Sequence, residues 1–232
     1  SRGLGDVYKR QWYINKTIEN GWSHSVLVHQ IESGLYERQV ATEKISNFKS
    51  HLASPQSELA IQTMKDPYIF DFIPFNESMI ERDIEQAVVK DITKLLLELG
   101  TGFAFLGNQY HLSIGGDDFY VDLLFYNLNL RCYVVIELKT GEFKPEYAGQ
   151  INFYLSAIDG MLKKEDDNPS IGLLLCKGKN KLVVEYALKD MSKPIGVSEY
   201  KITVDLPKEL DKQLPSAEDI QKRIKKLEAD NM

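Results

Sequence analysis

The pattern of apolar residues is densest between residues 119 and 140, where it predicts two neighbouring β-strands. The runs FYVDLLFY (119–126) and CYVVIELK (132–139) are dominated by Val, Leu, Ile, Tyr and Phe, which are enriched in strands. Between them, the break Asn-Leu-Asn at residues 127–129 suits a hairpin. We therefore expect the two strands to pair antiparallel in a mostly buried sheet.

A helix with one apolar face is predicted before this strand pair, over residues 78–99. Ser78 and Glu81 have the spacing of a capping box, and two glycines follow the other end. The face expected to pack on the sheet recurs at helical spacing and comprises Ile84, Val88, Ile92, Leu95 and Leu99. Two short runs, residues 103–107 and 109–114, then lead into the strand pair as an antiparallel meander.

After the strand pair the pattern changes to a strand, a crossover helix and another strand. The helix is predicted over residues 145–164, with Pro145 at a favoured first position, and residues 171–176 read as a buried parallel strand. A helix at residues 181–191 and a strand at 196–202 follow. Such a unit is right-handed, so the predicted fold class is α/β, with a mixed central β-sheet flanked by helices.

The N-terminal part is predicted to be a small all-α domain, with helices at residues 12–20 and 23–33. The two helices fit a DNA-binding helix-turn-helix and equally fit a plain packing module. In a DNA-binding helix-turn-helix, the phosphate contacts would come from Arg38, Lys44 and Lys49. Residues 50–77 lack sustained periodicity, and we place the domain junction there.

Four segments are therefore expected. Residues 1–11 lack an initiator Met and resemble translated adapter sequence, so we expect a non-native leader. Residues 12–65 form the helical domain, truncated at its N-terminus, and residues 66–206 form the α/β domain. Residues 207–232 are expected to be an amphipathic C-terminal helix, docked or self-associating.

Composition narrows the class of protein. Hydrophobic residues make up 43% of the chain, which is enough for a substantial core. No apolar run reaches the roughly eighteen residues of a membrane span and no signal peptide is visible, so we expect a cytoplasmic protein with no membrane contact. Cys132 and Cys176 lie in predicted strands and are expected to be reduced core residues. The four histidines lack zinc-site spacing.

The net charge of −6 lowers the expectation of tight, non-specific DNA binding without excluding it, because binding depends on local patches.

Three charged residues interrupt the apolar strand pair: Asp122, Glu137 and Lys139. Glu137 and Lys139 point to the same face, and a hairpin would place Asp122 directly or diagonally opposite Glu137. A Lys139–carboxylate pair on a solvated face is the plain alternative, but the flanks are almost wholly apolar. Because burying such groups is costly unless they are paired or bind a metal, we expect a functional site here.

Further polar residues flank this site in the sequence. Glu85 borders the apolar helix face and is a candidate third acid, with Glu81 as the alternative. Gln150 lies near the start of the helix that follows Lys139, where it either joins the site or faces solvent. Lys177, Lys179 and Lys181 gather in one loop, as an exposed turn or as phosphate contacts.

The order of these residues resembles the PDDEXK superfamily of restriction-endonuclease-like nucleases, which includes archaeal-type Holliday-junction resolvases. More narrowly, residues 66–206 closely resemble the bacterial YhcG-type proteins, as in DFYVDLLFYN and RCYVVIELKTGEFKPEYAGQINFYL. Residues 12–65 resemble the helical N-terminal domain of that family, cut short. Val121 stands where the superfamily's name has proline, a position that varies.

The resemblance implies that residues 66–206 are a PDDEXK nuclease domain that hydrolyses phosphodiester bonds in DNA with Mg²⁺ or Mn²⁺. Asp122, Glu137 and the Leu138 carbonyl are the expected metal ligands, with Glu85 binding directly or through water. Lys139 would orient the attacking water and stabilise developing negative charge.

It also implies that Gln150 supports the nucleophile or the adjacent phosphate. The side chains expected to contact nucleic acid are those of Lys144, Lys177, Lys179 and Lys181. The expected substrate is branched or duplex DNA, and a homodimer would fit an enzyme that cuts two strands. The alternative is a catalytically weak nucleic-acid-binding or assembly subunit of a defence, restriction or DNA-repair complex.

Overall fold

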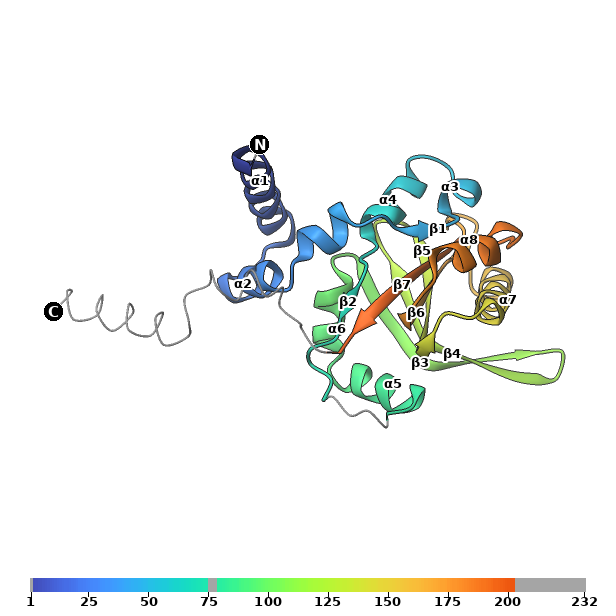
Figure 1. Ribbon diagram of the computed structural model, residues 1–232. Coiled ribbons are helices and arrows are strands. Elements are labelled where there is room, and N and C mark those ends of the chain that lie inside the picture. Colours follow the sequence, from blue (N-terminus) through green and yellow to red (C-terminus); the bar gives the residue numbers. More distant parts are fainter. Residues whose placement is uncertain (1, 75–78, 203–232) are drawn as a thin grey trace.

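The computed structural model describes residues 2–74 and 79–202, and Figure 1 shows a central sheet with helices around it. The predicted C-terminal helix at residues 207–232 lies outside this range. The helices are α1 (Arg2–Asn20), α2 (His24–Glu32), the π-helix η1 (Glu37–Ala41), α3 (Phe48–His51), α4 (Gln56–Thr63), α5 (Glu81–Lys90), α6 (Ile92–Leu99), α7 (Pro145–Met161) and α8 (Lys181–Lys189). The strands are β1 (Ile45–Ser46), β2 (Tyr68–Ile69), β3 (Phe103–Ile114), β4 (Asp117–Asn127), β5 (Cys132–Glu142), β6 (Ile171–Gly178) and β7 (Ile195–Lys201).

The sheet runs in the order β1-β7-β6-β5-β4-β3, and β2 also pairs with β7. Strands β3, β4 and β5 are antiparallel to one another, whereas β5, β6 and β7 run parallel. Helix α7 connects β5 to β6, as the strand-helix-strand pattern predicts. The predicted α/β class with a mixed central sheet is confirmed.

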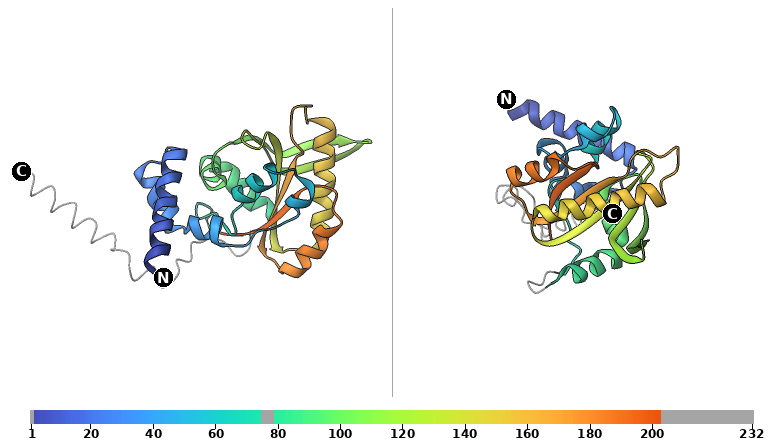
Figure 2. Two further views of the ribbon diagram at one scale, coloured as in Figure 1. Left: turned by 90° about the horizontal axis from the view of Figure 1, so that it is seen from above. Right: turned by 90° about the vertical axis from the view of Figure 1, so that its right-hand side faces the viewer.

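Helices cover both faces of the sheet, with α5 and α6 on one side and α7 and α8 on the other (Figure 2). The alternation of side chains along β5 explains this arrangement. Val134, Ile136 and Leu138 belong to the core beneath α5 and α6, while Val135 belongs to the core beneath α7. Among the described residues no helix combines the length and the apolar character needed to cross a membrane.

The single helix predicted over residues 78–99 was wrong, because the chain breaks at Asp91 into α5 and α6. The break lets both pieces bury their apolar residues in one core: Ile84 and Val88 from α5, and Leu95 and Leu99 from α6. The predicted start also differs. Helix α5 begins at Glu81, where the Asp83 carboxylate accepts a hydrogen bond from the backbone N–H of Ile80 at 3.1 Å, and Ser78 lies outside the described residues.

Residues 45–64 pack against the sheet. Strand β1 pairs with β7, and Phe48, Leu52 and Met64 are buried in the core that α5 and α6 cover. Helix α4 was not predicted from the sequence, because it buries only Ser57 and Ala60. These two residues are too small and too few to form a recognisable apolar stripe. The domain boundary at residue 65 stays a prediction, and this packing favours a boundary closer to residue 44.

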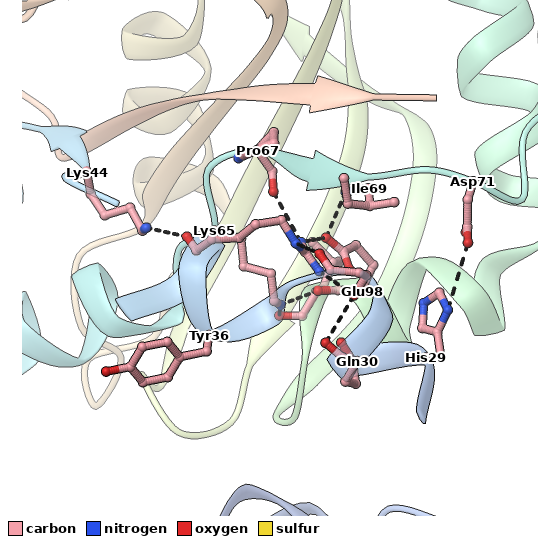
Figure 3. A network of polar contacts seen from close by, with 12 residues as sticks. His29, Gln30, Tyr36, Lys44, Lys65, Pro67, Ile69, Asp71 and Glu98 are labelled. Atoms are coloured by element: carbon pink, nitrogen blue, oxygen red, sulfur yellow. Dashed lines mark hydrogen bonds and ion pairs between the residues drawn. The ribbon is translucent and has the colours of Figure 1, made fainter. Parts of the chain in front are cut away.

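Arg38 is buried, so its predicted role as a phosphate contact was wrong. Its guanidinium forms an ion pair with Glu98 of α6 and donates hydrogen bonds to Ser33 and to the Pro67 carbonyl. The carboxylate of Glu98 also accepts a hydrogen bond from the N–H of Ile69 at 2.8 Å. Figure 3 shows this network, which joins the N-terminal helices to the sheet.

Lys44 was likewise predicted to contact phosphate, and this role stays a prediction, because the side chain is half-buried. Its ammonium donates hydrogen bonds to the carbonyls of Arg38 and Thr42. Burial, which disfavours the charged form, lowers the pKa of Lys44 to about 8. Lys49 is exposed, and its predicted role is not tested.

Gly172 lets α7 lie close against β6. A Cβ atom there would lie 2.8 Å from Cδ1 of Ile151 and 3.0 Å from Cδ1 of Leu155, and both side chains are buried. We expect Gly172→Ala to lower the free energy of unfolding by about 1–3 kcal/mol, because the crowded side chains have no free space to enter. Urea denaturation measures this change. Gly160→Ala is the control: it adds a methyl group to α7, where nothing lies within 4 Å of the new atom, and should leave stability equal or higher. Equal midpoints for Gly172→Ala and the parent would contradict the expectation.

Candidate active site

Two carboxylates face each other across the centre of the sheet. Leu123 pairs with Ile136, so the next residues along the ladder, Asp122 of β4 and Glu137 of β5, stand opposite each other as the hairpin predicted. The N–H of Asp122 donates to Oε1 of Glu137 at 3.2 Å, and the N–H of Leu138 donates to Oδ2 of Asp122 at 2.9 Å. Each carboxylate is therefore fixed by the backbone of the other strand.

Lys139 brings a positive charge to this pair. Its ammonium lies 3.4 Å from Oε2 of Glu137 and 3.7 Å from Oε2 of Glu81, and it lies 5.2 Å from the centre of the Tyr147 ring. The lysine is buried, and Tyr147 comes from α7 while Glu81 comes from α5. Helices on both faces thus hold the ammonium at the carboxylates.

Glu85 and Glu81 have different surroundings. Glu81 is 45% exposed, whereas Glu85 is 4% exposed. The Gln109 amide donates to Oε2 of Glu85 at 2.7 Å and to Oδ1 of Asp122 at 3.2 Å, and the Asn108 amide donates to Oε1 of Glu85 at 3.1 Å. Glu85 therefore joins Asp122 through a shared amide, while Glu81 joins Lys139. Which of them serves as the helix acid stays open at this point.

Gln109 and Asn108 are site residues that the sequence reasoning missed. Their signal was present as two consecutive polar amides between the apolar runs of β3. A polar pair at a strand break is common in exposed turns, so nothing in the sequence connected it with Glu85, which is 24 residues from Gln109.

Gln150 lies one turn from Tyr154 on α7 and donates a hydrogen bond to its hydroxyl at 3.1 Å. Gln150 is exposed, and Tyr154 is buried. Burial raises the pKa of Tyr154, the hydrogen bond from Gln150 lowers it, and the charges of Glu137 and Asp122 raise it further. Within the described residues, the hydrogen bond of the Gln150 side chain ends at Tyr154 and does not reach Asp122, Glu137 or Lys139.

Burial, together with neighbouring charges, shifts the pKa values of the site. Burial, and then the neighbouring Asp122, raises the pKa of Glu137 to about 8. Burial also raises the pKa of Asp122, against the lowering effects of the Leu138 N–H and of Lys139. Burial alone would lower the pKa of Lys139, but Glu137, Asp122 and Glu81 together hold it above its ordinary value. The ammonium therefore stays charged near neutral pH.

The predicted nucleic-acid contacts differ in exposure and in their ion-pair partners. The prediction that Lys179 contacts phosphate was wrong, because its side chain is 7% exposed and forms an ion pair with buried Asp66. Lys181 is exposed and pairs with Glu43 at 2.6 Å. Lys144 is exposed and lies 3.9 Å from Glu146, and Lys177 is also exposed.

A family model for the YhcG PDDEXK nuclease domain matches residues 61–215, which is more than half of the chain. The Escherichia coli (strain K12) protein described as "Putative nuclease YhcG" is 35% identical over 206 residues. This match covers 88% of the chain but 55% of the other protein, so the chain spans about half the length of the curated relative that it matches.

Two solved structures resemble the chain at low identity. A repair endonuclease from Pyrococcus abyssi aligns with a TM-score of 0.36 and 14% identity, over 58% of this chain and 50% of that one. A structure of EndoMS in complex with dsDNA aligns with a TM-score of 0.38 and 17% identity, over 60% of this chain and 49% of that one. The match to the family model assigns the chain to a family. In the structure, Asp122, Glu137 and Lys139 lie together on two adjoining strands. The chain belongs to the YhcG PDDEXK nuclease domain family.

Proposed function

We propose that this chain is a metal-dependent endonuclease that hydrolyses phosphodiester bonds in branched or duplex DNA. The observation that carries the proposal is the strand pair in which Asp122 and Glu137 face each other beside the Lys139 ammonium. Membership of a nuclease family supports the reaction class.

The site fits Mg²⁺ or Mn²⁺ by its charge and its donor atoms. Asp122, Glu137 and Glu81 lie around the ammonium of Lys139, and Glu85 shares an amide with Asp122, so a bound divalent cation would favour the charged form of these carboxyl groups. No three His, Cys, Asp or Glu side chains within residues 2–74 and 79–202 are grouped closely enough to hold a metal together. Asp122 and Glu137 would therefore bind it with the Leu138 carbonyl, and these hard oxygen donors suit either cation.

When bound, the cation supplies positive charge that polarises a scissile phosphate and helps to activate water. Lys139 contributes separately. Because its pKa is held above the ordinary lysine value, it acts as a charged hydrogen-bond donor rather than as a general base. From its place beside Glu137 it can orient a water and stabilise negative charge on a phosphate oxygen.

We assign the helix acid to Glu85 rather than Glu81. Glu85 is buried and shares an amide with Asp122, whereas Glu81 is half exposed and is engaged with Lys139. Gln150 would act on the nucleophile or phosphate from the exposed end of α7. Lys144 and Lys177, both exposed, are the proposed phosphate contacts, and exposed Lys181 can join them by leaving Glu43.

The proposal is tested by incubating the chain with branched, linear duplex and single-stranded DNA, each in Mg²⁺, in Mn²⁺ and in EDTA. We expect cleavage of at least one double-stranded substrate with metal, its loss in EDTA and its return when metal is added in excess, because charge offset at the carboxylates needs a cation. Gel electrophoresis of end-labelled DNA measures the products. Cleavage that persists in EDTA, or no cleavage of any substrate with either metal, would rule out the proposal.

A further inference from the structure

The carboxylate of Glu85 is held by neutral groups. It is 4% exposed, and its two oxygens accept hydrogen bonds from the side-chain amides of Asn108 and Gln109 at 3.1 and 2.7 Å. A buried carboxylate is ordinarily paired with a cation. Amide donors fix the position of Glu85 but leave its negative charge uncancelled, so that charge stays available to a cation in the site.

Gln109 is positioned to reach two carboxylates at once. It lies between Asn108 and Tyr110, whose partners on β4 are Leu123 and Val121, so it stands opposite Asp122. Its single amide donates both to Glu85, on a helix, and to Asp122, on a strand. One side chain therefore sets the spacing between the two acids.

The backbone of Gln109 supports a positional role. Its φ of +44° lies in the left-handed region, which is unfavourable for residues other than glycine. Residues held in such conformations cluster at functional sites. Glycine would relieve this strain, but it would also delete the amide that joins Glu85 to Asp122.

We infer that Gln109 is a positioning residue that holds Glu85 against Asp122, so that the negative charge of Glu85 supports a divalent cation bound by Asp122 and Glu137. This inference rests on the proposed function, which it deepens by assigning the third acid and the group that aligns it. Asn108 braces the second oxygen of Glu85.

The experiment measures Mn²⁺ binding to the chain without DNA, by isothermal titration calorimetry, together with melting temperature and DNA cleavage. We expect Gln109→Gly to weaken Mn²⁺ binding by about 10- to 100-fold, as loss of a group that orients a metal ligand does. Its melting temperature should stay close to that of the parent, because relief of the backbone strain offsets the loss of the hydrogen bonds to Glu85 and Asp122. Gln109→Asn keeps an amide and tolerates the left-handed region, so its affinity should lie between the two.

Two further variants separate positioning from general structure. Arg131→Gly is the matched control: Arg131 also has a positive φ, of +50°, at the exposed turn before β5, and this change should leave Mn²⁺ affinity unchanged. If Gln109 acts through Glu85, Gln109→Gly should cause little extra loss of affinity in a Glu85→Gln background.

The inference is overturned if Gln109→Gly binds Mn²⁺ like the parent, or if its effect adds in full to that of Glu85→Gln. A parent chain that binds Mn²⁺ with this dependence on Gln109 but cuts no DNA would refute the proposed function and leave the inference standing. A parent chain that binds no Mn²⁺ would overturn the inference as well.

Discussion

Asp122→Asn is expected to abolish measurable DNA cleavage while the protein stays folded. Asparagine keeps the shape of the side chain and an oxygen that can accept the Leu138 N–H, but it removes a charge that would bind the metal. Because burial makes the Asp122 carboxylate costly, its neutral replacement should change the free energy of unfolding by no more than about 1 kcal/mol. Initial cleavage rates and thermal melting measure the two effects.

Lys139→Met should act in the same direction, with a loss of roughly 10²- to 10³-fold in cleavage rate, since it removes a positioned charged donor. The matched control for Asp122→Asn is Asp117→Asn. Asp117 is an exposed residue at the start of β4, so it makes the same chemical change on the same strand, and its rate should equal that of the parent. Parent-like cleavage by Asp122→Asn or by Lys139→Met would remove these residues from the mechanism.

Arg38→Met should give the largest loss of stability, about 3–5 kcal/mol in the free energy of unfolding. The substitution leaves the carboxylate of Glu98 buried without its cation, and an uncompensated buried charge is strongly destabilising. It also leaves the Ser33 carbonyl without the hydrogen bond that Nε of Arg38 donates at 2.9 Å. Urea denaturation followed by circular dichroism measures the change.

Lys9→Met provides the comparison, because Lys9 pairs with Glu37 at the surface, where an ion pair is worth no more than about 1 kcal/mol. Adding Glu98→Gln to Arg38→Met should restore part of the loss by removing the unpaired charge. If Arg38→Met lowers the free energy of unfolding as little as Lys9→Met does, the buried network does not stabilise the fold.

The parts of the site that the sequence predicted are those that depend on neighbouring residues. Period-two alternation and a short turn were enough to place Asp122 opposite Glu137, and the three-residue spacing Glu-Leu-Lys was enough to put Lys139 on the same face as Glu137. The assignments of metal binding and of catalysis to these residues remain predictions.

The parts that the sequence did not predict depend on partners far along the chain. Arg38 and Lys179 both read as exposed cations, yet their carboxylates lie 60 and 113 residues away, and only folding brings them together. The choice between Glu81 and Glu85 likewise needed the amides of β3. A local pattern gives the face on which a side chain lies, but not the charge that it will meet there.

The strand pair, its central charged residues and the mixed α/β class were predictable from the sequence alone, because they follow from periodicity and from residue types within single elements. The family was predicted from the resemblance of residues 66–206 to YhcG-type proteins. The tertiary structure decided that the helix breaks at Asp91, that Gln109 joins Glu85 to Asp122, and which lysines are taken up by ion pairs. The reason is physical: burial and charge pairing depend on distances between segments, and these distances exist only once the sheet and its helices have packed.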